Sequence, residues 1–475
     1  MPASLARVFW QAAYNALLPL LLAAVRLAAL RSAKLRDTLA GQRGLWERLE
    51  AALAARAAGS AARPLLWFHV ASAGELLQAQ PVLERFAAEG TPCVLTVTSV
   101  SGMRWVERRR AELPPLLAVE YLPLDTRANM RRLLALLRPA ALVYTKYDLW
   151  PNLVWEAARA GVPQFLLAAT LHERSGRVRS APARSFYRTL YAPLAGIFAV
   201  TEADAARFLR TAPGHPGVEV LGDTRFDSVL ARRERIAPPP LPPYDGSGEG
   251  AGSAPGTVLV VGSSWPPDEQ RIFPVLREAL ARTPALRLLL VPHETDPAHL
   301  AAIEGAFAGH ALARFTALAP GAAPWRVLVV DTVGQLAALY GHAALAYVGG
   351  AFTTGVHNVM EPAAMGVPPI FGPFHQNSPE AMHLRDAGLA FAIETEADFR
   401  RVLFSLLDDP ARRARIGAQA RAWVESQAGA AQRAGERIRA ALAAHSATRS
   451  APSSAPPSGS PSAPPSGPPS APRGA

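Results

Sequence analysis

Cysteine and lysine are almost absent from this chain of 475 residues, and each absence excludes a class of protein. Cys93 is the single cysteine, so the chain can form neither an intramolecular disulfide framework nor a cysteine-based zinc site. We therefore expect the catalytic part to work in a reducing compartment. Only Lys34 and Lys146 are lysines, so arginine supplies nearly all of the basic residues behind the net charge of +11. A composition rich in arginine and alanine is typical of a GC-rich genome. We therefore do not interpret the positive charge as a nucleic-acid-binding groove.

Motifs for metal and P-loop chemistry are also missing. No G-x-x-x-x-G-K-[ST] sequence occurs, which argues against a P-loop enzyme. No Asp-x-Asp pair follows a predicted strand, where it would hold a cation against a nucleotide diphosphate. The histidines of the second half do not fall at metal-ligand spacings, and these are His293, His342, His357, His375 and His383. We therefore expect no metal site and no cofactor.

The N-terminal segment is a long apolar run. Residues 8–30 (VFWQAAYNALLPLLLAAVRLAAL) would form a helix of roughly 35 Å, which could cross a bilayer or lie along it. Four residues weaken the run as a spanning helix, namely Gln11, Asn15, Pro19 and Arg26. A basic flank that favours anionic head groups on the cytoplasmic side follows, with Arg31, Lys34, Arg36 and Arg43. We interpret residues 1–43 as a membrane-associated helix with its flank, and an ordinary buried helix is the alternative.

The rest of the chain alternates short apolar runs with helical stretches, which is typical of βαβ units with a parallel sheet. The first half predicts strands at 65–70, 93–99, 141–144, 164–169 and 196–200. The second half predicts strands at 257–264, 286–294, 326–331, 344–350 and 368–372. Half of all residues are apolar, so two such halves can each bury a core.

These patterns predict two similar α/β domains that face a cleft, at residues 44–236 and 257–445. The Pro- and Gly-rich stretch 237–256 breaks every period and is interpreted as a linker. Functional residues should follow the carboxyl ends of the strands. Residues 446–475 are rich in Pro, Ser, Ala and Gly with almost no charge, so we expect a disordered tail.

The first domain offers three candidate sites. The sequence W-F-H-V-A-S-A-G-E (67–75) ends a strand, turns at glycine and places Glu75 in the first turn of a helix, facing the cleft. Offsetting the helix dipole is the alternative role for this carboxylate. In Y-T-K-Y-D-L-W-P-N (144–152), Lys146 and Asp148 crowd a strand end, either as functional groups or as a surface ion pair. In G-D-T-R-F-D (222–227), Arg225 stands beside the linker, where its fork could bind a phosphate or carboxylate; pairing with a neighbouring aspartate is the alternative.

The second domain carries glycine-rich turns that lead into helices, an arrangement suited to phosphate. Pro292-His293-Glu294 follows one predicted strand, and Asp331-Thr332-Val333-Gly334-Gln335 begins a helix. The stretch 349–377 (GGAFTTGVHNVMEPAAMGVPPIFGPFHQN) places Asn358, Val359, Met360 and Glu361 at a helix start. Glu361 could bond ribose hydroxyls there.

In this order, the motifs resemble those of the 3-deoxy-D-manno-octulosonic acid (Kdo) transferases of lipopolysaccharide synthesis. They are S-x-G-E, L-W-P-N, G-[DN]-x-[KR]-F-D, D-T-x-G-x-L and G-G-x-F…G-x-H-N-x-x-E-P-A, over about residues 5–425. The resemblance implies the GT-B fold, two Rossmann-like domains facing an interdomain cleft. It also implies an inverting, metal-independent enzyme that moves Kdo from CMP-Kdo to a lipid A precursor (lipid IVA) at the cytoplasmic face of the inner membrane.

The resemblance further implies roles for individual residues. Glu75 is similar to the catalytic base, and Asp148 and Arg225 to groups that support the transition state. The stretches similar to those that bind CMP are Pro292-His293, Val333-Gly334-Gln335 and Asn358-Val359-Met360-Glu361. The chain departs from the family pattern at Lys146 and Asp148, where E-x-E often stands, at His293-Glu294, where Arg-His often stands, and at 168–175 (AATLHERS).

Two other functions remain open from the sequence. Another GT-B enzyme, either a lipid-linked nucleotide-sugar transferase or a sugar epimerase, would prefer a different donor. A two-domain solute-binding protein would close on its ligand without chemistry, and a cleft carboxylate at Glu75 argues against it.

Overall fold

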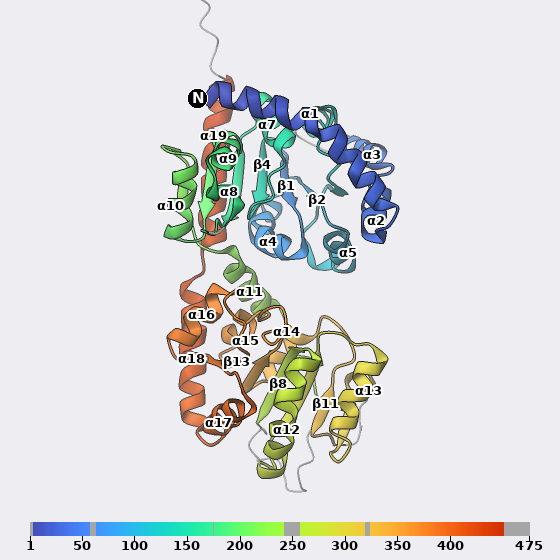
Figure 1. The fold of residues 1–475 in the computed structure, drawn as a ribbon, viewed down its shortest axis with the longest axis vertical. Helices are drawn as coiled ribbons and strands as arrows, with labels where there is room; N and C mark the ends of the chain where they lie inside the picture. Colours follow the sequence, from blue (N-terminus) through green and yellow to red (C-terminus); the bar gives the residue numbers. More distant parts are fainter. Residues whose placement is uncertain (1–2, 58–62, 174, 242–256, 319–323, 451–475) are drawn as a thin grey trace, which may run out of the picture.

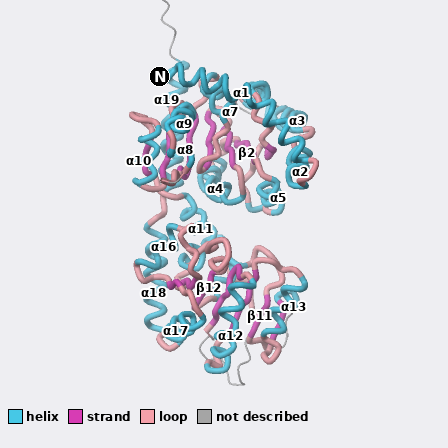
Figure 2. The backbone as a smooth tube through the Cα atoms, viewed as in Figure 1, coloured by secondary structure: helices cyan, strands magenta, loops and turns pink. Residues whose placement is uncertain are grey.

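The computed structural model describes residues 3–57, 63–173, 175–241, 257–318 and 324–450. These residues fold into two lobes that follow one another along the long axis in Figure 1. Each lobe is built on one seven-stranded sheet whose paired strands all run parallel. Helices surround both sheets, as Figure 2 shows. The predicted α/β class is therefore confirmed.

The sheet of the first lobe has the strand order β3-β2-β1-β4-β5-β6-β7. Its strands are β1 (Leu66–Val70), β2 (Cys93–Val97), β3 (Ala118–Tyr121), β4 (Ala141–Thr145), β5 (Gln164–Ala169), β6 (Gly196–Ala199) and β7 (Val218–Val220). The helices that precede and surround this sheet are α1 (Ala3–Ala29), α2 (Ala33–Gly41), α3 (Leu45–Ala57), α4 (Ala73–Ala88), α5 (Val100–Arg108), α6 (Arg127–Leu137), α7 (Pro151–Arg159), α8 (Gly176–Arg179), α9 (Ala181–Tyr191), α10 (Glu202–Thr211) and α11 (Thr224–Arg235).

The sheet of the second lobe has the order β10-β11-β9-β8-β12-β13-β14. Its strands are β8 (Val258–Ser264), β9 (Arg287–Pro292), β10 (Leu312–Arg314), β11 (Val327–Val329), β12 (Leu345–Val348), β13 (Pro369–Phe371) and β14 (Phe391–Ala392). Its helices are α12 (Pro266–Arg282), α13 (Pro297–Ala306), α14 (Leu336–Leu339), α15 (Met360–Ala364), α16 (Pro379–Asp386), α17 (Glu396–Leu407) and α18 (Pro410–Ser426).

All ten predicted strands are present, and the four that the sequence did not indicate, β3, β7, β10 and β14, are the edge strands of the two sheets. The central strands are fully buried, so they show as continuous apolar runs. The edge strands are short and partly exposed, which removes that signal.

Helix α19 (Ala430–Ser450) returns the chain to the first lobe. Ala431, Ala434 and Ile438 pack into the same core cluster as Phe68 of β1. The structure thus differs from the predicted second domain of 257–445, because residues from 430 onward pack on the first lobe. It also differs from the predicted tail, because residues 446–450 continue the helix; residues 451–475 lie outside the described part, as do 242–256 of the predicted linker.

Helix α1 lies along the first lobe beside α7 and α9 (Figure 1). Its inward residues bond to that lobe: Trp10 Nε1 donates to Ser185 Oγ (3.0 Å) and Tyr14 Oη to Asp125 Oδ2 (3.0 Å). Its outward residues are apolar and exposed, and they include Leu5, Val8, Phe9, Leu17, Leu20, Leu21 and Leu27. By length and composition α1 could cross a membrane. The polar face of α1 therefore packs on the first lobe, and its opposite face is an exposed apolar surface.

The lobes meet around α11. This helix packs both on α4 of the first lobe and on α15 of the second. Ion pairs cross the junction from α11, from Arg225 Nη1 to Glu380 Oε1 (3.1 Å) and from Arg232 Nη1 to Glu361 Oε1 (3.2 Å). The contact between the two lobes is thus made in part by ion pairs.

Candidate active site

Glu75 lies in the first turn of α4, directly beyond the carboxyl end of β1. Ser72 caps the helix by accepting a hydrogen bond from the Glu75 backbone N–H, and Glu75 Oε2 accepts one from Ala71 N at 2.6 Å. Only 5% of the residue is exposed. The pKa of this carboxyl is raised from 4.5 to about 7, chiefly by burial and in part by the charge of Asp148, while the Ala71 bond acts to lower it. A carboxylate of this pKa can both take up and release a proton near neutral pH.

Asp148 follows β4 and completes a network with His69 of β1. His69 Nε2 lies 3.0 Å from Asp148 Oδ2, and Trp150 Nε1 donates to the same oxygen at 3.2 Å. His69 Nδ1 lies 2.8 Å from the Thr96 hydroxyl, which orients the ring. Burial acts to raise the pKa of Asp148, but the hydrogen bonds from His69, Trp150 and Thr98 outweigh it, so the pKa falls. Asp148 therefore stays ionised beside Glu75.

Arg225 is not directed into open space. Its Nε donates to Asp223 Oδ2 at 2.8 Å, and its two terminal nitrogens bond both oxygens of Glu380 on α16, at 3.1 and 3.3 Å. Of the alternatives that the sequence left, the structure shows the pairing with an aspartate, extended by a carboxylate of the other lobe. Asp227, the other neighbouring aspartate, instead accepts from Gly429 N and Ala431 N at the start of α19.

In the second lobe, His293 lies exposed just beyond β9, while Pro292 is buried. The His293 ring stacks between Trp265 and His357, with centroids 4.4 and 4.7 Å apart. Trp265 Nε1 donates to His357 Nε2 at 3.1 Å, so His357 is held as the tautomer with an unprotonated Nε2. This stack places His293 of one predicted CMP-binding stretch against His357, the residue just before the stretch that starts at Asn358.

The other predicted residues of the second lobe divide by exposure. Val333 is 69% exposed, and Gly334 adopts φ 94° beside the Arg109 guanidinium of the first lobe. Val359 and Met360, in contrast, are buried in a core cluster, so their side chains cannot contact a ligand. They can contribute only backbone groups.

Asn358 and Glu361 flank that buried pair. Asn358 Oδ1 accepts from Met360 N at 3.0 Å. Burial raises the pKa of the Glu361 carboxyl, although the charges of Arg232 and Arg109 oppose this. Gln335 is partly exposed before α14. Glu361 and Gly334 thus both lie near Arg109, and a cavity of about 520 Å³ between α4, α11 and Gly334 adjoins them.

Three residues that hold the site together were not indicated by the sequence, namely His69, Asp125 and Trp265. His69 belongs to the W-F-H-V motif, and its position at the end of a strand could have shown it. Asp125 is buried and accepts from Asn152 N (2.9 Å) and Leu153 N (3.0 Å), so it caps α7 from a distant segment. No local sequence signal reveals such a cap.

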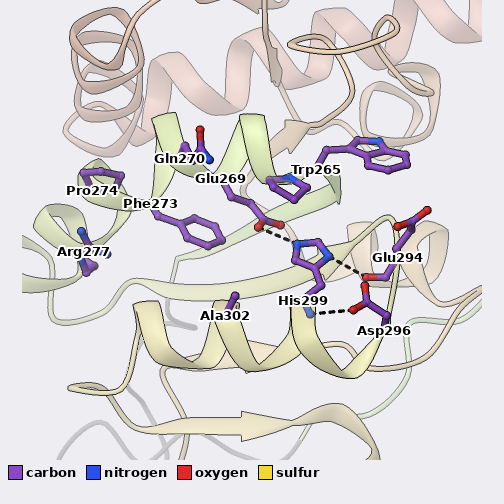
Figure 3. Close-up of a pocket in the computed structure, with 11 residues that line it drawn as sticks. Trp265, Glu269, Gln270, Phe273, Pro274, Arg277, Glu294, Asp296, His299 and Ala302 are labelled. Carbon is purple, nitrogen blue, oxygen red and sulfur yellow. Dashed lines mark hydrogen bonds and ion pairs between the residues drawn. The ribbon is translucent and has the colours of Figure 1, made fainter.

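A further pocket, of about 630 Å³, lies between α12 and α13 (Figure 3). It is lined by Trp265 and by His299, whose Nε2 lies 2.9 Å from Glu269 Oε2. Glu294 of the candidate stretch Pro292-His293-Glu294 lines it, whereas the residues expected to bind CMP do not. Within the described ranges, no three His, Cys, Asp or Glu side chains gather to hold a metal ion.

Comparisons with known proteins identify the family. The family model for 3-deoxy-D-manno-octulosonic-acid transferase matches residues 43–228. The chain is 32% identical to the 3-deoxy-D-manno-octulosonic acid transferase of Bordetella pertussis over 408 residues, covering 82% of this chain and 91% of that protein. It is 25% identical to the Haemophilus influenzae transferase over 419 residues, covering 86% of this chain and 93% of that protein.

Solved structures support the fold. UDP-GlcNAc 2-epimerase from Neisseria meningitidis superposes with a TM-score of 0.56 at 13% identity, covering 80% of this chain and all of that chain. A UDP-N-acetylglucosamine 2-epimerase described as putative, from Listeria monocytogenes, gives 0.55 at 12% identity, covering 82% of this chain and 98% of that one. The predicted GT-B fold is confirmed. The relatives over most of the chain also confirm the resemblance: this chain belongs to the 3-deoxy-D-manno-octulosonic acid transferase family.

Proposed function

We propose that the chain is an inverting glycosyltransferase that moves Kdo from CMP-Kdo to a lipid A precursor, lipid IVA, in lipopolysaccharide synthesis. The observation that carries this proposal is the buried Glu75 carboxyl at the end of β1, whose pKa is raised to about 7. A solute-binding protein has no use for a carboxyl so poised, because charging it in a buried position destabilises the fold.

Glu75 is the general base in this mechanism. It takes the proton of the acceptor hydroxyl as that oxygen forms a bond to the anomeric carbon of Kdo. On the opposite face of the sugar, the bond from that carbon to the phosphate oxygen breaks, and CMP leaves with the electron pair. A positioned base of this kind contributes on the order of 10²–10⁴-fold to the rate.

Asp148 and Arg225 support the transition state from two sides. Asp148 stays ionised through its bonds to His69 and Trp150, so its negative charge faces the positive charge that develops on the sugar. Arg225 stabilises the phosphate that leaves. Its guanidinium is paired with Glu380, so this role requires the donor phosphate to take the place of Glu380 when the lobes close.

The donor is bound by the second lobe through Pro292-His293, Val333-Gly334-Gln335 and Asn358 to Glu361. Support comes from the exposure of His293, Val333 and Gly334 and from the partly buried Glu361 carboxyl. Since Val359 and Met360 are buried, their backbone groups alone take part. The mechanism uses no metal and no nucleic acid.

The acceptor is presented at the cytoplasmic face of the inner membrane. The exposed apolar face of α1 and the basic residues of α2 support attachment to an anionic bilayer surface. Because the polar face of α1 is bonded to the first lobe, we propose that the helix lies in the membrane surface and does not span it.

The test is incubation of the purified chain with CMP-Kdo and lipid IVA, followed by mass analysis of the lipid. We expect addition of Kdo by the native chain and its loss in Glu75→Gln. The fold neighbours are UDP-GlcNAc 2-epimerases, so UDP-GlcNAc is the comparison substrate. If the chain turned over UDP-GlcNAc but not CMP-Kdo, the proposed Kdo transfer would be wrong and a UDP-sugar enzyme would take its place.

A further inference from the structure

The carboxyl ends of β4 and β5 hold two neighbouring residues in a strained backbone conformation. Lys146 has φ 63° and Ala168 has φ 48°, values that residues other than glycine rarely adopt. The two lie side by side, because Lys146 N donates to Leu167 O at 2.7 Å. Strain of this kind persists where the surrounding structure enforces it, and it concentrates at functional sites.

Two hydroxyls at the same strand ends have no hydrogen-bond partner. Thr145 Oγ1, on the last residue of β4, and Thr170 Oγ1, just after β5, are buried and unpaired within the described part of the chain. Thr145 is fully buried. Buried hydroxyls are normally hydrogen-bonded, so two unpaired ones mark these strand ends as unusual. The Thr145 side chain is closed to solvent, so its hydroxyl is not itself a ligand contact.

Two cations lie on the same exposed aromatic ring. Lys146 Nζ is 5.3 Å and Arg177 Cζ 4.6 Å from the ring centroid of Tyr147, which is 40% exposed. Neither cation makes an ion pair with a described residue, and the nearby acidic residue Glu173 already pairs with Arg207 and Arg210. Two unpaired like charges beside one ring favour an anion between them.

We propose that Lys146 and Arg177, which both lie against the exposed Tyr147 ring, form a subsite for an anionic group of the acceptor. The group is a phosphate or a sugar carboxylate, since both accept several hydrogen bonds from cations. This rests on the proposed Kdo transfer and deepens it.

The acceptor side is assigned from the position of Lys146. Its charge is close enough to lower the pKa of Glu75, the proposed base, which must meet the acceptor hydroxyl. The three stretches proposed to bind the donor are on the other lobe, and Arg225, proposed to meet the donor phosphate, lies on α11 at the junction of the lobes. An anion held at Lys146 therefore belongs to the molecule that brings the hydroxyl.

The experiment compares Lys146→Met and Arg177→Met with Arg179→Met, which removes an exposed arginine from the same short helix α8. Steady-state transfer by the full chain is measured with lipid IVA, with dephosphorylated lipid IVA and with lipid IVA that already carries one Kdo. We expect the first two variants to raise the acceptor KM by roughly ten- to a hundredfold, the effect of losing one charge-assisted hydrogen bond. The donor KM and the Arg179→Met variant should stay near the native values.

The acceptor forms separate the two anions. If dephosphorylation removes the difference between native and variant enzymes, the subsite binds phosphate. If the difference persists without phosphate and grows with the added Kdo, it binds carboxylate. Equal acceptor KM values for all three variants, or a rise in the donor KM instead, overturn the proposal.

A second variant separates the subsite from simple structure. Lys146→Gly relieves the positive φ, so we expect a higher melting temperature together with a higher acceptor KM. A lower melting temperature would assign Lys146 a structural role. If the native chain transfers no Kdo, the proposed function fails, and calorimetric titration with inorganic pyrophosphate still decides the subsite. If pyrophosphate binds the native chain but not the double variant Lys146→Met with Arg177→Met, the subsite is supported. If both proteins bind pyrophosphate equally, the subsite is overturned.

Discussion

The substitution Glu75→Gln should make the protein more stable while it removes activity. The glutamine keeps an oxygen that can accept from Ala71 N but cannot ionise. The pKa of Glu75 is raised from 4.5 to about 7 in the folded chain, chiefly by burial. At about 1.4 kcal/mol per pKa unit, charging this group costs the folded state roughly 3 kcal/mol.

The sign follows from proton linkage. Because the pKa of Glu75 is higher in the folded than in the unfolded chain, the folded state holds a proton that the unfolded state has released between pH 4.5 and about 7. The native protein therefore loses this stability as pH rises through about 7, and the glutamine variant does not. The free-energy advantage of Glu75→Gln should grow with pH and reach roughly 3 kcal/mol above pH ~8.

The assay is denaturant and thermal unfolding of both proteins from pH ~5.5 to ~8.5, in parallel with Kdo transfer. Transfer should fall by about 10²–10⁴-fold. Glu47→Gln is the matched control, because Glu47 is also in the first turn of a helix, α3, but is exposed. It should change neither transfer nor the pH dependence. A stability difference for Glu75→Gln that does not vary with pH, or transfer near the native rate, refutes the reasoning.

Three further predictions follow from other contacts. Glu380→Gln should lower the KM for CMP-Kdo by roughly two- to fivefold, because Glu380 competes with the donor phosphate for Arg225; an unchanged or higher KM in initial-rate kinetics contradicts this. Tyr14→Phe removes the hydroxyl that lowers the pKa of Asp125, a group whose pKa burial raises to about 7. In denaturant unfolding at a series of pH values, the loss of stability on ionising Asp125 should therefore extend roughly 0.5–1 pH unit higher, whereas Ser185→Ala, which removes another hydroxyl bonded to α1, should leave it in place. Leu20→Ser should weaken sedimentation with anionic vesicles by roughly tenfold, and no change would exclude α1 as the membrane contact.

The sheets could be predicted from sequence because their central strands are buried on both faces. Runs such as LLWFHV (65–70) and TVLVVGSS (257–264) then have no polar alternation, and the helices between them keep the helical period. The edge strands β3 and β14 are partly exposed and short, so nothing distinguishes them from loops. The return of α19 was also not indicated, since among its described side chains the contacts with the first lobe combine small alanines with only two large apolar residues, Ile438 and Leu442.

The site was predictable only in its outline. Strand ends and glycine turns located Glu75, Asp148 and the second-lobe stretches correctly relative to the sheets, because parallel strands bring their carboxyl ends to one edge. Pairings could not be predicted where the partners are far apart in sequence. Arg225 meets Glu380, 155 residues away, and Trp265 meets His357, 92 residues away.

The polar residues inside the N-terminal apolar run have a structural explanation that bears on catalysis. Asn15 exchanges hydrogen bonds with Asn152, and Tyr14 donates to Asp125, which caps α7. Helix α7 begins at Pro151, immediately after the loop that carries Asp148. Asn15, one of the residues that weaken α1 as a spanning helix, therefore also fastens it to α7, beside the loop that carries Asp148. A helix that freely crossed the bilayer would set no fixed distance between the membrane and Asp148. A helix docked along the first lobe does, so under the proposed function we expect an acceptor whose acyl chains remain in the bilayer to meet Glu75 and Asp148 at a defined height.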